Sequence, residues 1–165
     1  LLEYPGFGDR PGQPSEATLL AAADEAAALL SGVTNLYLIG ESLGAGVACH
    51  LAGSLGTRVA GVLLIVPYNR MTDVAAAHYP WLPVSLLLRH RFDPAADAVH
   101  CAMPLLAIVA AGDSIIPVER SRAVHDAWAG AKAWLVVPDV DHNTLGATRE
   151  FWDGIARFLD RVAAR

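Results

Sequence analysis

The chain contains a serine, an aspartate and a histidine that each follow shortly after an apolar stretch. These residue types together can form an activated nucleophile. Ser42 lies in Gly40-Glu41-Ser42-Leu43-Gly44, between the aliphatic run 36–39 and the Ala-rich stretch 45–55. A G-x-S-x-G pentapeptide between a strand and a helix is typical of a nucleophile elbow. Its turn is tight enough to require small residues two positions either side of the serine, and its strained backbone lifts the hydroxyl above the sheet. The pentapeptide alone is also compatible with an ordinary Gly-Ser turn.

A serine hydroxyl needs a base, and the base needs an orienting acid. Asp113 follows the apolar run 105–110, and His142 follows the run 133–137. The chain order Ser, Asp, His fits an elbow serine, and all three residues fall at the carboxyl ends of predicted parallel strands. We therefore predict Ser42 as nucleophile, His142 as base and Asp113 as orienting acid, with the N–H of Leu43 as an oxyanion donor.

Other acids and histidines compete for these roles. Asp139 is the second candidate for the acid, whereas Asp141 adjoins His142 and projects in a different direction. His50 and His125 fall inside predicted helices and are expected to be structural or surface residues. Three more histidines lie in an irregular stretch and could line a pocket: His78, His90 and His100.

The elements that must position these residues alternate between strand and helix. Apolar residues at helical spacing indicate helices, with Ser15 as the first N-cap, and continuously apolar runs indicate parallel strands covered on both faces. The expected order is the tail of a strand at 1–4, helix 16–30, strand 34–39, helix 43–55, strand 59–66, strand 105–110, helix 118–129, strand 133–137 and helix 148–163. Such alternation predicts the α/β class, with a mostly parallel sheet flanked by helices in one domain, 1–165. The proline- and aromatic-rich stretch of about 67–102 is expected to form a small helical cap.

Composition narrows the function classes. The chain has 165 residues, 54% hydrophobic and 18% charged, with a net charge of −5 and no basic cluster, so we expect one well-packed core and no nucleic-acid partner. No apolar run reaches the ~18 residues of a membrane span. Cys49 and Cys101 match no metal or redox spacing and are expected to be buried free thiols in a reducing, cytoplasmic protein. Because the chain begins at Leu1 rather than Met, an upstream targeting segment is left open.

The ordered motifs resemble those of α/β-hydrolase serine esterases, especially the branch with acyl-protein depalmitoylases and lysophospholipase-like enzymes. Nearly the whole chain takes part, through Glu3-Tyr4-Pro5-Gly6-Phe7-Gly8, Pro14-Ser15-Glu16, Gly40 to Ala48, Tyr79-Pro80-Trp81-Leu82-Pro83-Val84, Asp113-Ser114-Ile115-Ile116-Pro117 and His142-Asn143. The resemblance implies hydrolysis of esters or thioesters through an acyl-serine intermediate, with no metal and no cofactor.

The resemblance also implies strands that this sequence does not contain. It enters at what resembles the end of the fourth strand of the family, so we expect an N-terminally truncated α/β-hydrolase fold. The second oxyanion donor usually follows the third strand, and loss of one such donor costs on the order of 100- to 1000-fold in turnover. Without the third strand, 36–39 is expected to be an unpaired apolar edge that could self-associate, unless 1–4 pairs beside it.

Two classes of function follow from the sequence. The first is a serine hydrolase acting on small acyl esters or thioesters, with membrane lipids among the candidate substrates and the cap roofing an apolar pocket. The second is a catalytically silent module that binds a ligand or dimerises, and a peptidase on the same fold is a weaker third. The residues expected to line the substrate pocket are Glu41, Tyr68, Trp81, Leu82 and Ile115.

Overall fold

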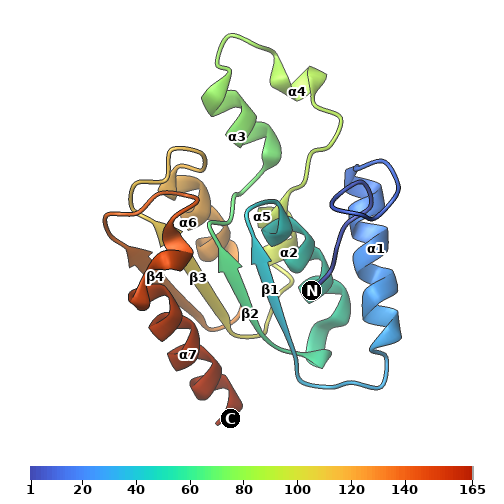
Figure 1. Cartoon of the computed structure of the whole chain (residues 1–165), viewed down its shortest axis with the longest axis vertical. Coiled ribbons are helices and arrows are strands. Elements are labelled where there is room, and N and C mark those ends of the chain that lie inside the picture. The colour runs from blue at the N-terminus through green and yellow to red at the C-terminus, as the bar shows by residue number, and fades with distance from the viewer. Residues whose placement is uncertain (165) are drawn as a thin grey trace.

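A computed structural model of the chain describes residues 1–164 as a parallel four-stranded sheet flanked by helices (Figure 1). The α/β class predicted from the sequence is therefore confirmed. The strands are β1 (Leu36–Glu41), β2 (Val59–Ile65), β3 (Leu105–Ala110) and β4 (Lys132–Val137). The helices are α1 (Glu16–Leu29), α2 (Leu43–Leu55), α3 (Met71–His78), α4 (Val84–Leu87), α5 (Pro94–Ala98), α6 (Val118–Ala127) and α7 (Arg149–Ala163), with short 3₁₀ turns at Gly56–Arg58 and Leu145–Ala147.

The strands lie side by side in chain order, β1-β2-β3-β4, and every pair is parallel. Each crossover carries a helix, which brings all four carboxyl ends to one edge of the sheet. β1 runs two residues further than expected and includes Gly40 and Glu41, so Ser42 directly follows the strand. Both Ser42 and the loops after β3 and β4 therefore lie at that edge.

Both faces of the central strands are covered, because successive side chains of a strand point to opposite sides. Val62 and Leu64 of β2 pack in a core cluster with α2, α5 and α6. Leu63 and Ile65 pack in a second cluster with α7. α1 lies outside α2 and adds a third cluster that includes Leu19 and Val47. Continuous apolar runs in β2 and β3 therefore reflect burial on both faces.

The cap is smaller than the 67–102 stretch expected from the sequence. α3 and α4 rise beyond the carboxyl ends of the strands as a projection from the body (Figure 1), and neither helix has a buried residue. α5 instead returns to the core, where Ala98 is fully buried and the helix packs against α2 and α6. The cap thus spans roughly α3, α4 and the loops that join them to the body.

The segment 1–4 does not form the predicted strand end, and that prediction is wrong. Within residues 1–164, β1 pairs only with β2 and is an edge strand. α7 covers β2, β3 and β4 but leaves β1 uncovered, so Tyr37 and Ile39 are exposed on that face. An isolated extended segment needs a strand partner to be stable, and within residues 1–164 no strand pairs with the segment 1–4. No helix in the described part of the chain is long and apolar enough to cross a membrane.

Candidate active site

Ser42 has the strained backbone expected of an elbow. Its φ of 50° and ψ of −116° lie in a region that non-glycine residues rarely adopt. Its N–H is held by the carbonyl of Ile65 at 2.9 Å, and α2 begins at the next residue. A Cβ on Gly40 would lie 2.7 Å from Cβ of Ala48, so the strand can approach α2 this closely only with glycine at position 40.

Gly44 departs from the expectation that both flanking positions must be small. A Cβ there would meet only the Tyr4 hydroxyl, at 3.6 Å, which is an ordinary contact. The tight packing of the turn therefore lies on the strand side of Ser42. The helix side faces the loop that carries Tyr4.

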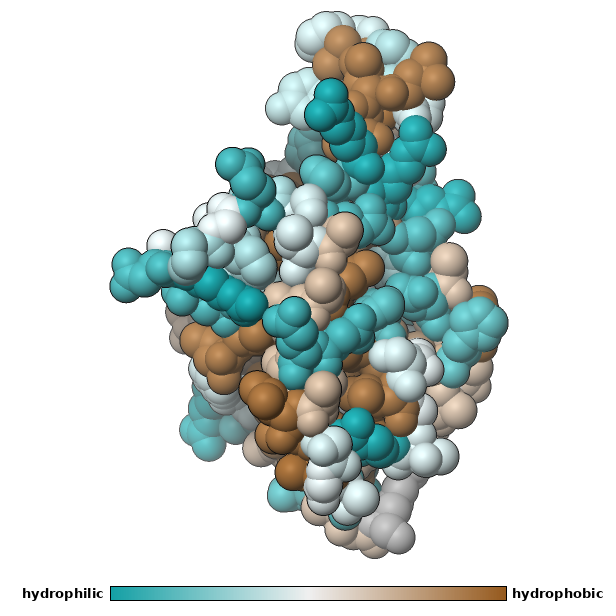
Figure 2. Space-filling model, turned by 90° about the vertical axis from the view of Figure 1, so that its right-hand side faces the viewer, coloured by the Kyte–Doolittle hydropathy of each residue, from teal (hydrophilic) through white to brown (hydrophobic). Residues whose placement is uncertain are grey.

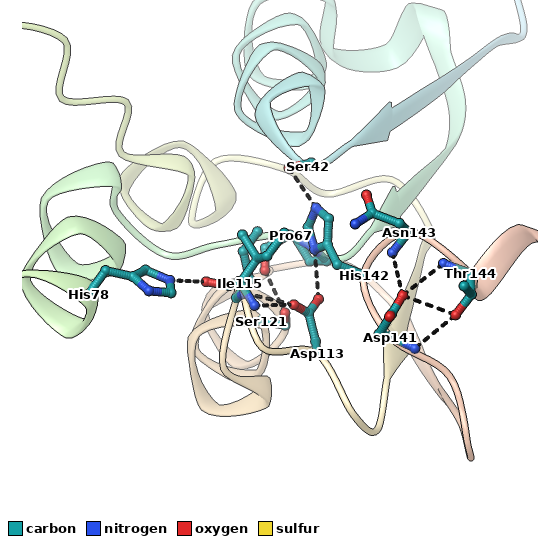
Figure 3. Close-up of polar contacts among 11 residues, drawn as sticks. Ser42, Pro67, His78, Asp113, Ile115, Ser121, Asp141, His142, Asn143 and Thr144 are labelled. Carbon is teal, nitrogen blue, oxygen red and sulfur yellow. Dashed lines mark hydrogen bonds and ion pairs between the residues drawn. The ribbon is translucent and has the colours of Figure 1, made fainter.

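The structure brings Ser42, His142 and Asp113 into one hydrogen-bonded chain (Figure 3). Nε2 of His142 lies 3.1 Å from Oγ of Ser42, and Nδ1 lies 2.8 Å from Oδ2 of Asp113. The side chains of His142 and Asp113 are only 9% and 2% exposed. A neutral imidazole with Nδ1–H donating to the carboxylate presents Nε2 as an acceptor to the serine hydroxyl. This arrangement can take the proton of Ser42 and keep the resulting imidazolium next to a buried negative charge.

Backbone donors fix the carboxylate of Asp113. Its second oxygen, Oδ1, accepts hydrogen bonds from the N–H groups of Ile115 and Ile116, at 2.9 and 2.8 Å. Each oxygen thus has its own partners, and the carboxylate cannot rotate without losing several bonds. The loops after β3 and β4 are also joined, because the N–H of Gly112 donates to the carbonyl of Val140 at 3.0 Å.

The two competing acids, Asp139 and Asp141, are not the hydrogen-bond partners of Nδ1 of His142. Asp139 has a positive φ of 57°, and no hydrogen bond links it to His142 among the residues described. Asp141 accepts hydrogen bonds from the backbone N–H groups of Asn143 and Thr144 and from the Thr144 hydroxyl. These bonds, first that from Asn143, lower the pKa of Asp141 below its ordinary value. Asp141 therefore shapes the turn that carries His142.

The remaining histidines lie outside the hydrogen-bonded chain. His50 pairs with Asp24 on the outer side of α2, and His125 packs edge-on against Trp134. His78 lies 2.7 Å, through Nε2, from the carbonyl of Ile115, so it ties α3 to the loop that holds Asp113. His90 accepts from the N–H of Glu16 through Nδ1, and His100 is exposed.

An open cleft of about 930 Å³ lies over Ser42. Glu41 and Leu43 line it, as do Asn143 and the loop residues Tyr4 and Phe7. Leu43 is the first residue of α2, where the N–H groups have no partner within the helix and form the positive end of its dipole. The aromatic residues within the Gly/Pro-rich segment 3–8 were the sequence signal that could have placed this loop in the cleft.

Four residues expected in the pocket do not line this cleft. Tyr68 is buried among core residues, where burial raises the pKa of its phenol and its hydroxyl has no hydrogen-bond partner. Trp81 and Leu82 lie on the cap, and Ile115 is a loop residue whose carbonyl bonds His78. Their aromatic or apolar type led to the expectation, but the sequence did not reveal which of them face the cleft.

A second, apolar pocket lies beside the cleft. The sequence led us to expect an apolar pocket under the cap but did not identify the residues that line this one. It has a volume of about 230 Å³ and shares Phe7 and Leu43 with the cleft. Its apolar walls come from the first loop, α1, α2 and the base of the cap: Phe7, Leu19, Leu43, Met71, Leu88 and Phe92. Leu43 follows Ser42, so this pocket opens next to the serine.

The ordered parallel sheet, the elbow at the end of β1 and the cap above it define the class: the chain has the α/β-hydrolase fold, as its motifs predict. The structure is similar to that of monoacylglycerol lipase from Paleococcus ferrophilus, with a TM-score of 0.69, 16% identity, and coverage of 98% of this chain and 81% of that one. It is likewise similar to a bromoperoxidase from Bacillus anthracis, with a TM-score of 0.72, 16% identity, and coverage of 96% and 80%.

Relatives are also found by sequence. An uncharacterized protein of Mycobacterium tuberculosis is 37% identical over 170 residues, which cover 99% of this chain and 60% of that protein. Lysophosphatidylserine lipase ABHD12 of Danio rerio is 27% identical over 154 residues, 79% of this chain and 39% of the lipase. The chain thus spans about 60% of the first relative's length and less of the second. No protein-family model matches the chain.

Proposed function

We propose that this chain is a serine hydrolase that cleaves carboxylic esters or thioesters through an acyl-serine intermediate. The observation that carries the proposal is the hydrogen-bonded chain from Asp113 through His142 to Ser42, on a strained elbow at the floor of a cleft. A strained serine backbone is costly, and strain of this kind gathers at functional sites. Its combination with a hydrogen bond from the serine hydroxyl to a buried histidine is typical of a reactive serine.

In the proposed mechanism, Oγ of Ser42 attacks the carbonyl carbon while Nε2 of His142 takes the hydroxyl proton. The carbonyl oxygen becomes an oxyanion that accepts a hydrogen bond from the N–H of Leu43. The tetrahedral intermediate then collapses, and the departing alcohol or thiol leaves with the proton from His142. Water, deprotonated by the same imidazole, attacks the acyl-serine. The second tetrahedral intermediate breaks its bond to Oγ of Ser42, which takes the proton back from His142, and the carboxylic acid is released. Throughout, Asp113 holds the ring and stabilises its positive charge.

The acyl chain of the substrate would lie in the apolar pocket. Leu43 borders both the cleft and this pocket, so an acyl chain attached to Ser42 has a direct route into it. The fold is shared with a monoacylglycerol lipase, and a sequence relative is named a lysophosphatidylserine lipase. Both support lipid-like acyl esters as the substrate class.

A fluorophosphonate probe tests the proposal, because it reacts covalently with an activated serine. We expect labelling of the wild-type chain, loss of labelling in Ser42→Ala, and unchanged labelling in the control Ser54→Ala, whose hydroxyl lies on the exposed side of α2. A wild-type chain that never reacts, or label that survives Ser42→Ala, would defeat the proposal.

One observation favours the alternative of a silent binding or dimerisation module. The edge strand β1 exposes Ile39 to 59% and Tyr37 to 37%, next to backbone groups without a strand partner in residues 1–164. Such an edge can pair with another chain. A concentration-dependent dimer without turnover of p-nitrophenyl esters would favour this function. Turnover of amides, but not of esters, would instead indicate a peptidase.

A further inference from the structure

The far end of the cap carries large apolar side chains that are each more than half exposed to solvent. Trp81 is 75% exposed, Leu86 80%, Leu87 61% and Tyr79 52%. Figure 2 shows hydrophobic residues at the top of the molecule, among paler ones, with hydrophilic residues below them. We call these four residues the cap tip. Exposed apolar patches of this kind mark interaction sites, because single exposed hydrophobes are ordinary but clusters are not.

The cap tip is held in place. The guanidinium of Arg91 donates to the carbonyls of Ser85 and Leu88, at 2.8 and 3.2 Å, which pins the end of α4. The backbone N–H of Arg91 donates to the Glu16 carboxylate at 2.8 Å, which ties the loop to α1. On the other side, His78 bonds the carbonyl of Ile115. These hydrogen bonds fix both ends of the segment that carries the exposed apolar side chains.

The charges around the cap tip differ from those of the rest of the chain. The segment 74–91 contains no acidic residue, whereas it contains two arginines and two histidines, in a chain whose net charge is −5. The acids at the base of the cap are paired: Asp73 lies 3.6 Å from Arg120, and Asp93 lies 2.7 Å from Arg70. Arg89, two residues after Leu87, is exposed and makes no ion pair among the residues described.

We propose that the cap tip docks the chain onto the surface of an anionic lipid bilayer. Three features favour a bilayer. The tip is a projection rather than a groove (Figure 1), which suits a soft, flat partner. It combines leucines with Trp81 and Tyr79, and amphipathic aromatic rings prefer the headgroup level of a membrane. Its neighbouring positive charge complements anionic headgroups.

Docking in this way also turns the site toward the bilayer. The tip lies on the side of the sheet to which the carboxyl ends of the strands point, and Ser42 lies at that edge. Met71, at the base of the cap, and Leu88, which directly follows the tip residue Leu87, line the apolar pocket that reaches Leu43. A lipid acyl chain would therefore find an apolar path from the docked surface to the serine. Docking itself does not rest on the proposed hydrolase activity.

Vesicle co-sedimentation tests the proposal, with the full chain carrying Ser42→Ala so that no lipid is consumed. We expect binding to vesicles of phosphatidylcholine and phosphatidylglycerol, and weaker binding to phosphatidylcholine alone. Leu86→Ser with Leu87→Ser should weaken binding about 100-fold, since each leucine loses about a tenfold contribution. Arg89→Ala should weaken it about fivefold. The matched control is Leu29→Ser, an 88% exposed leucine at the far end of α1, which should bind like the parent.

Trp81 provides a second readout, because it lies in the tip and is itself fluorescent. Lipids brominated near the headgroup should quench the part of the emission that disappears in Trp81→Phe. Failure of the parent to bind either vesicle, equal binding to both, or equal loss in the Leu29 control would overturn the proposal. So would a dimer that depends on Leu86 and Leu87 and forms without vesicle binding, since a second copy would then be the occupant. Vesicle binding without fluorophosphonate labelling of the Ser42 form would leave docking intact and remove only the hydrolase.

Discussion

Replacement of Asp113 by asparagine would keep the shape of this side chain and remove its charge. Oδ1 of Asp113 accepts two backbone N–H bonds, from Ile115 and Ile116, and only an oxygen can accept them. The amide oxygen of the variant should therefore take the place of Oδ1, and its NH₂ group should face Nδ1 of His142, now 2.8 Å from Oδ2. Because NH₂ donates, Nδ1 must accept, and the ring proton moves to Nε2. That tautomer cannot take the proton of Ser42.

The expected cost is about 10⁴-fold in kcat, the loss that follows when a Ser-His-Asp arrangement is given the wrong tautomer. This corresponds to about 5 kcal/mol of transition-state stabilisation. Hydrolysis of p-nitrophenyl butyrate measures kcat, and the rate of fluorophosphonate labelling measures the reactivity of Ser42 directly. Circular dichroism should show an unchanged fold, since both backbone donors keep an acceptor.

The control is Asp139→Asn, which alters the second candidate acid and should change kcat by less than about twofold, because surface changes away from the site have small effects. Retention of kcat within about tenfold in Asp113→Asn would refute the role assigned to Asp113. Loss in Asp139→Asn as large as that in Asp113→Asn would show that the acid had been misassigned.

Three further outcomes are expected. Gly40→Ala should lower the free energy of unfolding by about 1–3 kcal/mol in urea titrations, because its Cβ would overlap the start of α2, whereas Gly44→Ala should cost much less. Leu88→Asp should reduce kcat/KM for an octanoyl ester about tenfold relative to an acetyl ester, since the longer chain would have to displace water from the carboxylate in the pocket; equal losses for both esters would contradict this. Burial raises the pKa of the Cys101 thiol from 9.0 to about 12. Because the pKa is higher in the folded state, the protonated thiol stabilises the fold below pH 9, and this contribution is lost as the pH rises toward 12. The loss of stability at alkaline pH should therefore be smaller in Cys101→Ala.

Much of the fold follows from short stretches of sequence. The helix at 43–55 and the strand at 105–110 have the bounds that their composition predicts, and the other helices and strands of the body agree within two residues, except for the first strand-like segment, 1–4, and the cap. Gly56 and Ser15 mark helix ends as their types suggest. Local propensity suffices here because each of these elements has its own apolar face or run.

The misplaced features are those that depend on a partner distant in sequence. The segment 1–4 has strand-like residues, but no strand pairs with it in the described part of the chain, so it stays irregular. Tyr68 has the chemistry of a pocket residue, yet the core around α2 buries it. α5 lies in the proline-rich stretch for which the sequence predicts a cap. In the structure it belongs to the body, where Ala98 is buried between α2 and α6.

The order of serine, aspartate and histidine, and their positions after apolar runs, can be read from the amino-acid sequence because motif spacing and periodicity are local properties of the chain. The packing of the folded chain was needed to show that Asp113 rather than Asp139 meets His142, and that the cap presents Trp81 and the leucines of α4 to solvent. Both outcomes depend on how loops separated by tens of residues pack together. Hydrogen bonds and burial between such loops arise only when the sheet brings its strand ends to one edge.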